Sequence, residues 1–177
     1  MPSVYLAGKV PKDVKEVNSY NDWREGFQEK CSELSDIKIE FLNPNQGDWS
    51  MPMNKYFGRD VEMIKKSDAI VMDGTVRMGA GTAQEILIAK YYNKPVILVC
   101  PKNSHYDRII KTKNGESVHY QHPFLIETVD LIVRSFEQAA KALIEHFNKN
   151  KIINPKSIDL IEKSRLDYLK FIAPTGN

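Results

Sequence analysis

The stretch that decides the fold runs from residue 68 to residue 100 and reads DAIVMDGTVRMGAGTAQEILIAKYYNKPVILVC. It begins with an apolar segment, Asp68–Met72, and passes through a glycine-bearing loop into a periodic run, Thr82–Tyr92. It ends in a second apolar segment, Pro95–Cys100. Nearly all-apolar segments that alternate with a helical pattern are typical of parallel strands buried on both faces. The stretch therefore predicts a strand–helix–strand unit.

The same alternation extends in both directions along the chain. Further strands are expected at 4–7, 37–42 and 131–133, and further helices at 20–34, 54–66, after a cap at Ser135, and at 157–171. Strand and helix repeated about five times predict a doubly wound α/β fold, either flavodoxin-like or Rossmann-like. We expect a mainly parallel five-stranded sheet flanked by helices.

The domain organisation follows from length and linker content. The 177 residues suit one domain, 1–177, in which 155–177 form a C-terminal helical extension. Residues 101–123 are polar and irregular, and a loop of that length is often a lid or an interface element.

Bulk composition excludes several classes of protein. The net charge of +2, with acids and bases interspersed, argues against binding of a nucleic-acid polymer. No apolar run approaches the ~18 residues of a membrane span. The first residues lack the pattern of a signal peptide, and the two cysteines match no disulfide or metal motif. A cytoplasmic protein is the expectation.

Ligands bind at the carboxyl ends of the strands in such sheets. Those ends carry Gly8-Lys9, Asn43-Pro44, residues 73–81 and Pro101-Lys102. We expect the site to be assembled from these loops.

Residues 79–85, Gly-Ala-Gly-Thr-Ala-Gln-Glu, allow two interpretations. Thr82-x-x-Glu85 has the form of a capping box, in which Glu85 only stabilises the helix start. Alternatively, Gly79 and Gly81 let a ligand approach the backbone, and the helix N-terminus keeps a first-turn carboxylate ionised. Glu85 would then be a half-buried nucleophile suited to an electrophilic sugar carbon.

Two common nucleotide motifs do not fit this stretch. The dinucleotide fingerprint GxGxxG would need glycine where Gln84 stands, and it would follow the first strand instead of the third. A P-loop would need GK[ST], which is absent from the sequence.

The order of these elements resembles that of the nucleoside 2-deoxyribosyltransferase family. The resemblance covers roughly residues 3 to 100, and it rests on Tyr5-Leu6-Ala7-Gly8, Asp60, Ser67-Asp68-Ala69-Ile70-Val71, Gly79 to Ile86 and Lys94-Pro95-Val96.

The resemblance implies a reaction and three catalytic residues. Glu85 would attack C1′ of a 2′-deoxynucleoside or deoxynucleotide, displace the base and form a deoxyribosyl ester. A second base, or water, would then resolve the ester. Asp60 stands where the family places a second carboxyl that assists the leaving base, and Tyr5 would orient the nucleophile. The chemistry needs no cofactor and no metal.

The candidate substrate contacts are Gly8, Lys9, Trp23, Asn43, Gly79 and Gly81. Gly8 would admit the sugar, and Trp23 is either a core residue or a wall against which the base stacks.

The sequence departs from the family at the sugar 5′ end. Met78 and Gly79 stand where the family often has Asp or Ser. The choice between a free nucleoside and a 5′-monophosphate therefore stays open. Lys9, Lys12 and Arg77 are candidate phosphate contacts.

The family commonly completes its site with residues of a neighbouring subunit, so the resemblance implies a homo-oligomer with sites near its interfaces. The segment 101–123 and Asn177 are candidates for that role. His119-x-x-His122 alone does not make a metal site.

Two other functions remain open. Gly79-x-Gly81-Thr82-x-x-Glu85 matches the tail of the PGGxGTxxE motif of lysine-decarboxylase-like nucleoside-monophosphate phosphoribohydrolases, although Arg77-Met78 replace its leading Pro-Gly. A hydrolase would release the base and the sugar phosphate. A non-catalytic nucleotide-binding module would keep the glycines but would not need Glu85 or Asp60.

Overall fold

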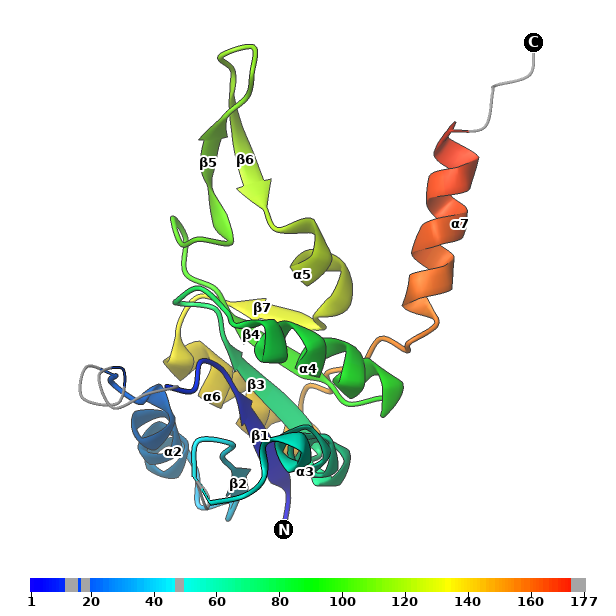
Figure 1. Cartoon of the computed structure of the whole chain (residues 1–177). Coiled ribbons are helices and arrows are strands. Elements are labelled where there is room, and N and C mark those ends of the chain that lie inside the picture. The colour runs from blue at the N-terminus through cyan, green and yellow to red at the C-terminus, as the bar shows by residue number, and fades with distance from the viewer. Residues whose placement is uncertain (12–15, 17–19, 47–49, 173–177) are drawn as a thin grey trace.

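The computed structural model describes residues 1–11, 16, 20–46 and 50–172, and a five-stranded parallel sheet is its centre (Figure 1). The strand order is β2-β1-β3-β4-β7. The strands are β1 (Ser3–Ala7), β2 (Glu40–Leu42), β3 (Ala69–Asp73), β4 (Val96–Val99) and β7 (Leu131–Val133). This order is the flavodoxin-like one of the two predicted arrangements.

Helices cover both faces of the sheet, as predicted (Figure 1). One face carries α2 (Trp23–Leu34) and α6 (Phe136–Phe147), and the other carries α3 (Met53–Lys66), α4 (Ala80–Tyr91) and α5 (Pro123–Thr128). Ser135 caps α6 as expected, because its hydroxyl accepts a hydrogen bond from the Gln138 N–H at 3.2 Å.

The side chains of β1 show how one strand serves both layers. Val4 and Leu6 belong to the core beneath α2 and α6, whereas Tyr5 and Ala7 belong to the core beneath α3 and α4. All four are fully buried. A strand buried on both faces reads as a continuous apolar run, which is why the sequence revealed it.

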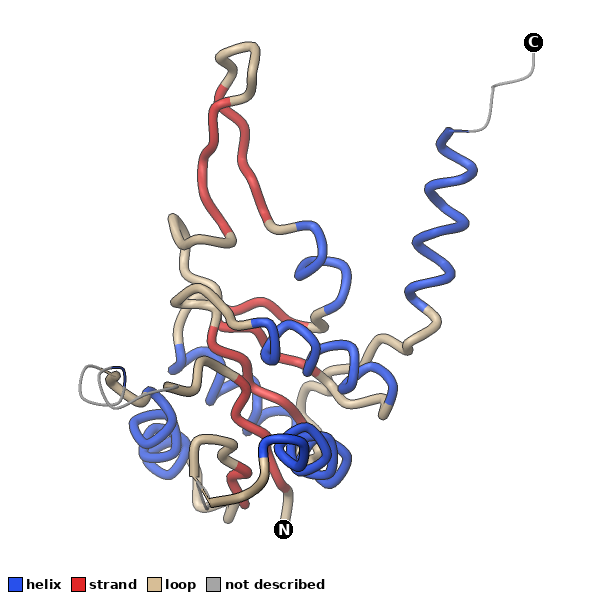
Figure 2. Tube along the Cα trace, viewed as in Figure 1, coloured by secondary structure: helices blue, strands red, loops and turns tan. Residues whose placement is uncertain are grey.

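The expectation of an irregular segment at 101–123 was wrong. The chain forms an antiparallel hairpin there, β5 (Asp107–Lys111) and β6 (Ser117–Gln121), which projects from the body (Figure 2). Its turn carries Gly115 at φ 82°, the left-handed conformation that glycine adopts without strain. The hairpin was missed because most of its side chains are exposed and polar, so no apolar alternation marks it.

The last helix, α7 (Leu160–Ile172), stands clear of the sheet and its helices (Figure 1). It buries none of its residues. None of the helices in the described part of the chain is long and apolar enough to cross a bilayer.

Two predicted apolar faces were partly wrong. Helical spacing predicts that Leu34 shares the buried face of Trp23, Phe27 and Cys31, and that Phe57 shares the face of Ile64, but both side chains are exposed.

Candidate active site

The carboxyl edge of the sheet is where the chain changes direction between neighbouring strands. From β1 the chain passes through α2 to β2 on one side, and it returns through α3 to β3 on the other side of β1. Loops that diverge in this way leave a crevice at the strand ends, the usual ligand position of this fold. The loop after β3 lies at this edge, and Tyr5 lies two residues before the end of β1.

Tyr5 and Glu85 are in direct contact. The Tyr5 hydroxyl donates a hydrogen bond to Glu85 Oε1 at 2.9 Å, which joins β1 to α4 across 80 positions of sequence. The other oxygen, Oε2, is buried and has no hydrogen-bond partner among the described residues. Buried polar atoms without a hydrogen-bond partner are uncommon in proteins, so this oxygen is a candidate reactive atom.

The capping-box interpretation of Glu85 was wrong. Helix α4 begins at Ala80 with Gly79 as its N-cap, no side chain caps it, and its first turn holds no acidic residue. Glu85 lies in the second turn, and its Oε1 faces Tyr5 instead of the helix start. Thr82 is buried within the helix.

The expectation that Glu85 stays ionised because of the helix N-terminus was also wrong. Burial raises the pKa of Glu85 to about 7, and the negative charge of Asp60 adds to this rise, while the Tyr5 hydrogen bond and the Arg24 charge oppose it. The group is thus divided between its acid and its carboxylate near neutral pH. That is a useful pKa for a nucleophile that must also be released as a leaving group.

Asp60 lies on α3, in the layer that also holds α4, and its pKa is raised by burial. Arg59 opposes that rise, because its Nε donates to Asp60 Oδ1 at 2.9 Å. The Arg59 side chain also donates to the Pro44 carbonyl at 2.9 Å, which ties this acid to the chain after β2. The charge of Asp60 acts on both Tyr5 and Glu85. The three predicted catalytic residues are therefore brought together.

The three glycines predicted to contact the substrate lie in different surroundings. A Cβ at Gly8 would lie 2.9 Å from Trp23 Nε1 and 3.2 Å from Asp73 Cβ, so close packing of protein groups already requires this glycine. Gly79 and Gly81 have open space where a side chain would be, and Gly79 has an ordinary φ of −77°. The structure leaves room beside these two for a ligand and shows no backbone strain there.

Three other predicted contacts are engaged in protein structure. Asn43 is buried, and its side chain accepts from the Asn45 N–H at 2.8 Å to close a turn after β2. Trp23 stacks on Phe136 with ring centroids 4.8 Å apart, which favours its interpretation as a core residue. Lys9 pairs with Glu16 at 3.4 Å.

Among the candidate phosphate contacts, Arg77 is exposed on the loop before α4. Lys12 and Asn177 lie outside the described residues.

From the sequence alone Arg24 could be a surface residue or a phosphate contact, but it is fully buried, with its hydrogen bonds at the end of β1. Its guanidinium donates to three main-chain carbonyls, those of Leu6 at 3.0 Å, Gly8 at 3.1 Å and Lys9 at 3.3 Å. Because buried arginines are uncommon, composition and periodicity give no signal for this role. Its position just after the N-cap Asp22 is the only local hint.

The base of the hairpin contacts the loop before α4. Tyr106 is buried, and its hydroxyl accepts a hydrogen bond from the Met78 N–H at 2.6 Å. Asp107 lies beside it and accepts from His119, Gln121 and Arg134, which lowers the pKa of Asp107 to about 2, the His119 hydrogen bond contributing most. The segment expected to be a lid or an interface element is therefore held by its base to the loop before α4.

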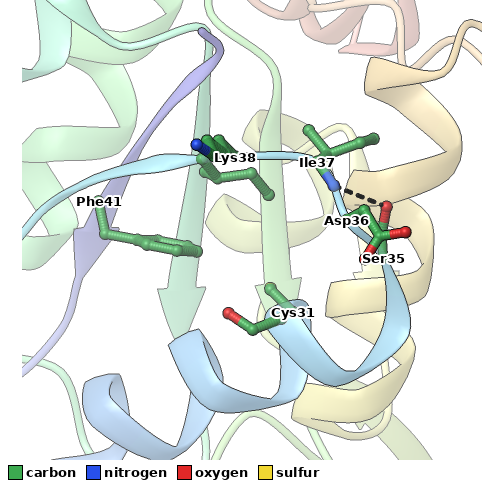
Figure 3. Close-up of a pocket in the computed structure, with 8 residues that line it drawn as sticks. Cys31, Ser35, Asp36, Ile37, Lys38 and Phe41 are labelled. Atoms are coloured by element: carbon green, nitrogen blue, oxygen red, sulfur yellow. Dashed lines mark hydrogen bonds between the residues drawn. The ribbon is translucent and has the colours of Figure 1, made fainter.

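Two hollows lie away from these residues. One, of about 350 Å³, lies at the amino end of β2, where the Ile37 N–H donates to Ser35 Oγ at 3.2 Å and Cys31 lies below (Figure 3). The other, of about 410 Å³, is an apolar groove between α4, α5 and the start of α7.

Within the described ranges, no three His, Cys, Asp or Glu side chains are grouped to hold a metal ion, and the His119 side chain is hydrogen-bonded to Asp107.

The arrangement can be compared with known proteins. No protein-family model and no curated protein matches the sequence. The fold is that of a solved deoxyribosyltransferase. The 2-deoxyribosyltransferase from Leishmania mexicana superposes with a TM-score of 0.56 at 17% identity, covering 82% of this chain and 99% of that one. A CMP N-glycosidase from Clostridium botulinum superposes with a TM-score of 0.48 at 16% identity, over 80% of this chain and 98% of that one.

Proposed function

We propose that this protein is an enzyme that cleaves the N-glycosidic bond of a 2′-deoxynucleoside or deoxynucleotide and transfers the sugar to another nucleobase. The observation that carries the proposal is the contact between Tyr5 and Glu85. One carboxylate oxygen is held by a hydroxyl, and the other is buried without a partner in the described part of the chain. The deoxyribosyltransferase fold supports the same conclusion.

In the first half of the reaction, Glu85 Oε2 bonds to C1′ and the bond from C1′ to the base nitrogen breaks. Its electron pair leaves with the base, which takes a proton from the acid form of Asp60. Burial raises the pKa of Asp60, so this acid form is more abundant than in a solvated aspartate. The developing positive charge on the sugar is stabilised by the carboxylate beside it.

In the second half, an acceptor attacks C1′ and the ester oxygen returns to Glu85 as a carboxylate. The Tyr5 hydroxyl then again donates to a full negative charge. Asp60 removes the proton from an acceptor base as it attacks. If water reaches C1′ first, the products are free sugar and base, and the enzyme acts as a hydrolase.

The test is incubation with 2′-deoxynucleosides and their 5′-monophosphates, with and without a free acceptor base, followed by chromatography. A new nucleoside formed only when acceptor is present indicates transfer, and free sugar or sugar phosphate indicates hydrolysis. Glu85→Ala should abolish turnover while the fold survives. Glu62→Gln, which removes an exposed acid of α3 paired with Lys66, is the matched control and should retain activity.

A covalent intermediate gives a second readout. Acid quenching during turnover should leave a deoxyribosyl group on the peptide that contains Glu85. If no substrate turns over, and Glu85→Ala binds nucleotides as tightly as the wild type, the protein is a binding module and the proposal is wrong.

A further inference from the structure

Arg24 is the largest fully buried side chain in the described part of the protein. Burying a guanidinium is costly unless hydrogen bonds and an opposite charge compensate it. Here the compensation is specific, because Nη1 donates to Asp22 Oδ1 at 2.9 Å and to the Tyr20 hydroxyl at 3.1 Å, in addition to the three carbonyls of Leu6, Gly8 and Lys9. These hydrogen bonds and the ion pair with Asp22 form a specific polar site, which packing of the hydrophobic core alone would not require.

The position of Arg24 links it to the proposed nucleophile. Its Nε bonds to the Leu6 carbonyl, one residue after Tyr5, and its Nη2 would lie 3.4 Å from a Cβ at Gly8. The charged and titratable groups that act on Glu85 are Tyr5 from β1, Asp60 from α3 and Arg24 from α2. Arg24 is the cation of this group, and it opposes the rise in pKa of both Tyr5 and Glu85.

We propose that Arg24 is a positioning residue of the site: its guanidinium fixes the end of β1, next to Tyr5, and places a positive charge near Glu85. The expected effect of Arg24 on turnover rests on the proposed function. Its expected effect on the ionisation of Glu85 does not, so the proposed function and the role of Arg24 can be refuted separately.

The first experiment needs no substrate. The titration of Glu85 is followed by NMR on protein carrying carbon-13 at glutamate side-chain carboxyls, with the signal assigned by Glu85→Gln. Arg24→Gln should move the midpoint upward by about one pH unit, the order expected for removal of one nearby buried charge. Asp22→Asn should move it downward, because the guanidinium then loses its counter-ion. Asparagine caps a helix as well as aspartate does, so this variant should fold.

Arg134 offers a matched control. Like Arg24, it donates to a main-chain carbonyl at the carboxyl edge of the sheet, that of Cys100 at 2.9 Å, and it pairs with a buried acid, Asp107. Arg134→Gln should leave the midpoint of Glu85 unchanged. The inference is overturned if Arg24→Gln moves the midpoint no more than this control does. Should Arg24→Gln fail to fold, an unchanged midpoint in Asp22→Asn overturns it.

The second experiment separates charge from geometry. Arg24→Lys keeps the charge but cannot reach three carbonyls at once with a rigid fork. The midpoint of Glu85 should then stay near that of the wild type, while kcat/KM for glycosidic cleavage falls at least tenfold. In Arg24→Gln the acid limb of the pH–rate profile should move upward with the NMR midpoint. A wild-type protein that titrates as expected but cleaves nothing would refute the proposed function and leave the role of Arg24 in place.

Discussion

At the scale of single residues, Glu85 combines a buried position with an ionisable group. Its pKa of about 7 lies above that of a solvated glutamate because burial disfavours the charge. In the unfolded chain the group titrates near its ordinary value. The folded state therefore holds more protons than the unfolded state between those two pH values, and the contribution of Glu85 to stability declines as pH rises through that window.

We predict that Glu85→Gln stabilises the protein at alkaline pH and not at acidic pH. At pH 8 the substitution removes a buried charge, and the gain should be on the order of 3 kcal/mol. At pH 4 the wild-type side chain is already neutral, and the two proteins should unfold alike. Chemical denaturation at the two pH values measures the difference. An equal gain at both would show that the charge of Glu85 is not the cause.

Tyr5 makes a second prediction at this scale. Its hydrogen bond opposes the rise in the pKa of Glu85. Tyr5→Phe should therefore raise the pH at which turnover reaches half of its maximum and lower kcat/KM about tenfold or more at pH 6. At high pH much of the activity should return. A loss of the same size at every pH would mean that Tyr5 acts only through orientation.

At the scale of elements, the base of the hairpin is coupled to the loop before α4, because the Tyr106 hydroxyl accepts a hydrogen bond from the Met78 N–H. Tyr106→Phe leaves that N–H without its acceptor, which should cost about 1–3 kcal/mol of stability. Hydrogen exchange should quicken in residues 74–82. Tyr120→Phe removes the same kind of hydroxyl from the same hairpin and is the control. Unchanged exchange in the first variant would contradict the coupling.

The elements differ in how far the sequence could predict them. The strands β1, β3 and β4 were predictable, because burial on both faces leaves uninterrupted apolar runs such as Ile70–Met72. The hairpin was not, since most of its side chains are exposed and polar and leave no apolar alternation. In the candidate site, Tyr5, Asp60 and Glu85 were predicted from the order of motifs. Arg24 and Tyr106 were missed, because their roles consist of contacts with main-chain atoms.

At the scale of the whole molecule, α7 buries none of its residues against the rest of the described chain. A helix of 13 residues without tertiary packing is marginal in water. Leu160, Ile161 and Ser164 of its first turns line the apolar groove against α4 and α5, and Tyr168, Phe171 and Ile172 continue the same stripe outward. The exposed rings of Phe124 and Tyr91 lie on the neighbouring helices α5 and α4. A second copy of the chain, with two such stripes packed antiparallel, would cover this surface.

We predict that the protein self-associates through α7. The four exposed rings of Tyr91, Phe124, Tyr168 and Phe171 can each bury roughly 150 Å² or more, and with the aliphatic side chains they approach the ~800 Å² per partner of a stable interface. Light scattering should show a dimer or larger assembly. Tyr168→Glu with Phe171→Glu should yield a monomer, while Lys163→Gln on the polar face should not. A wild-type monomer at tens of micromolar would contradict the prediction.

The projecting hairpin has a practical consequence for handling the molecule. Its two strands contact each other far more than they contact the body, and residues 113–116 of its turn are exposed. A peptide bond cut there would separate no packed layer. The tip is thus a natural place to insert a fluorescent label or an affinity tag, or to relocate the chain ends in a circular permutant, without disturbing the sheet.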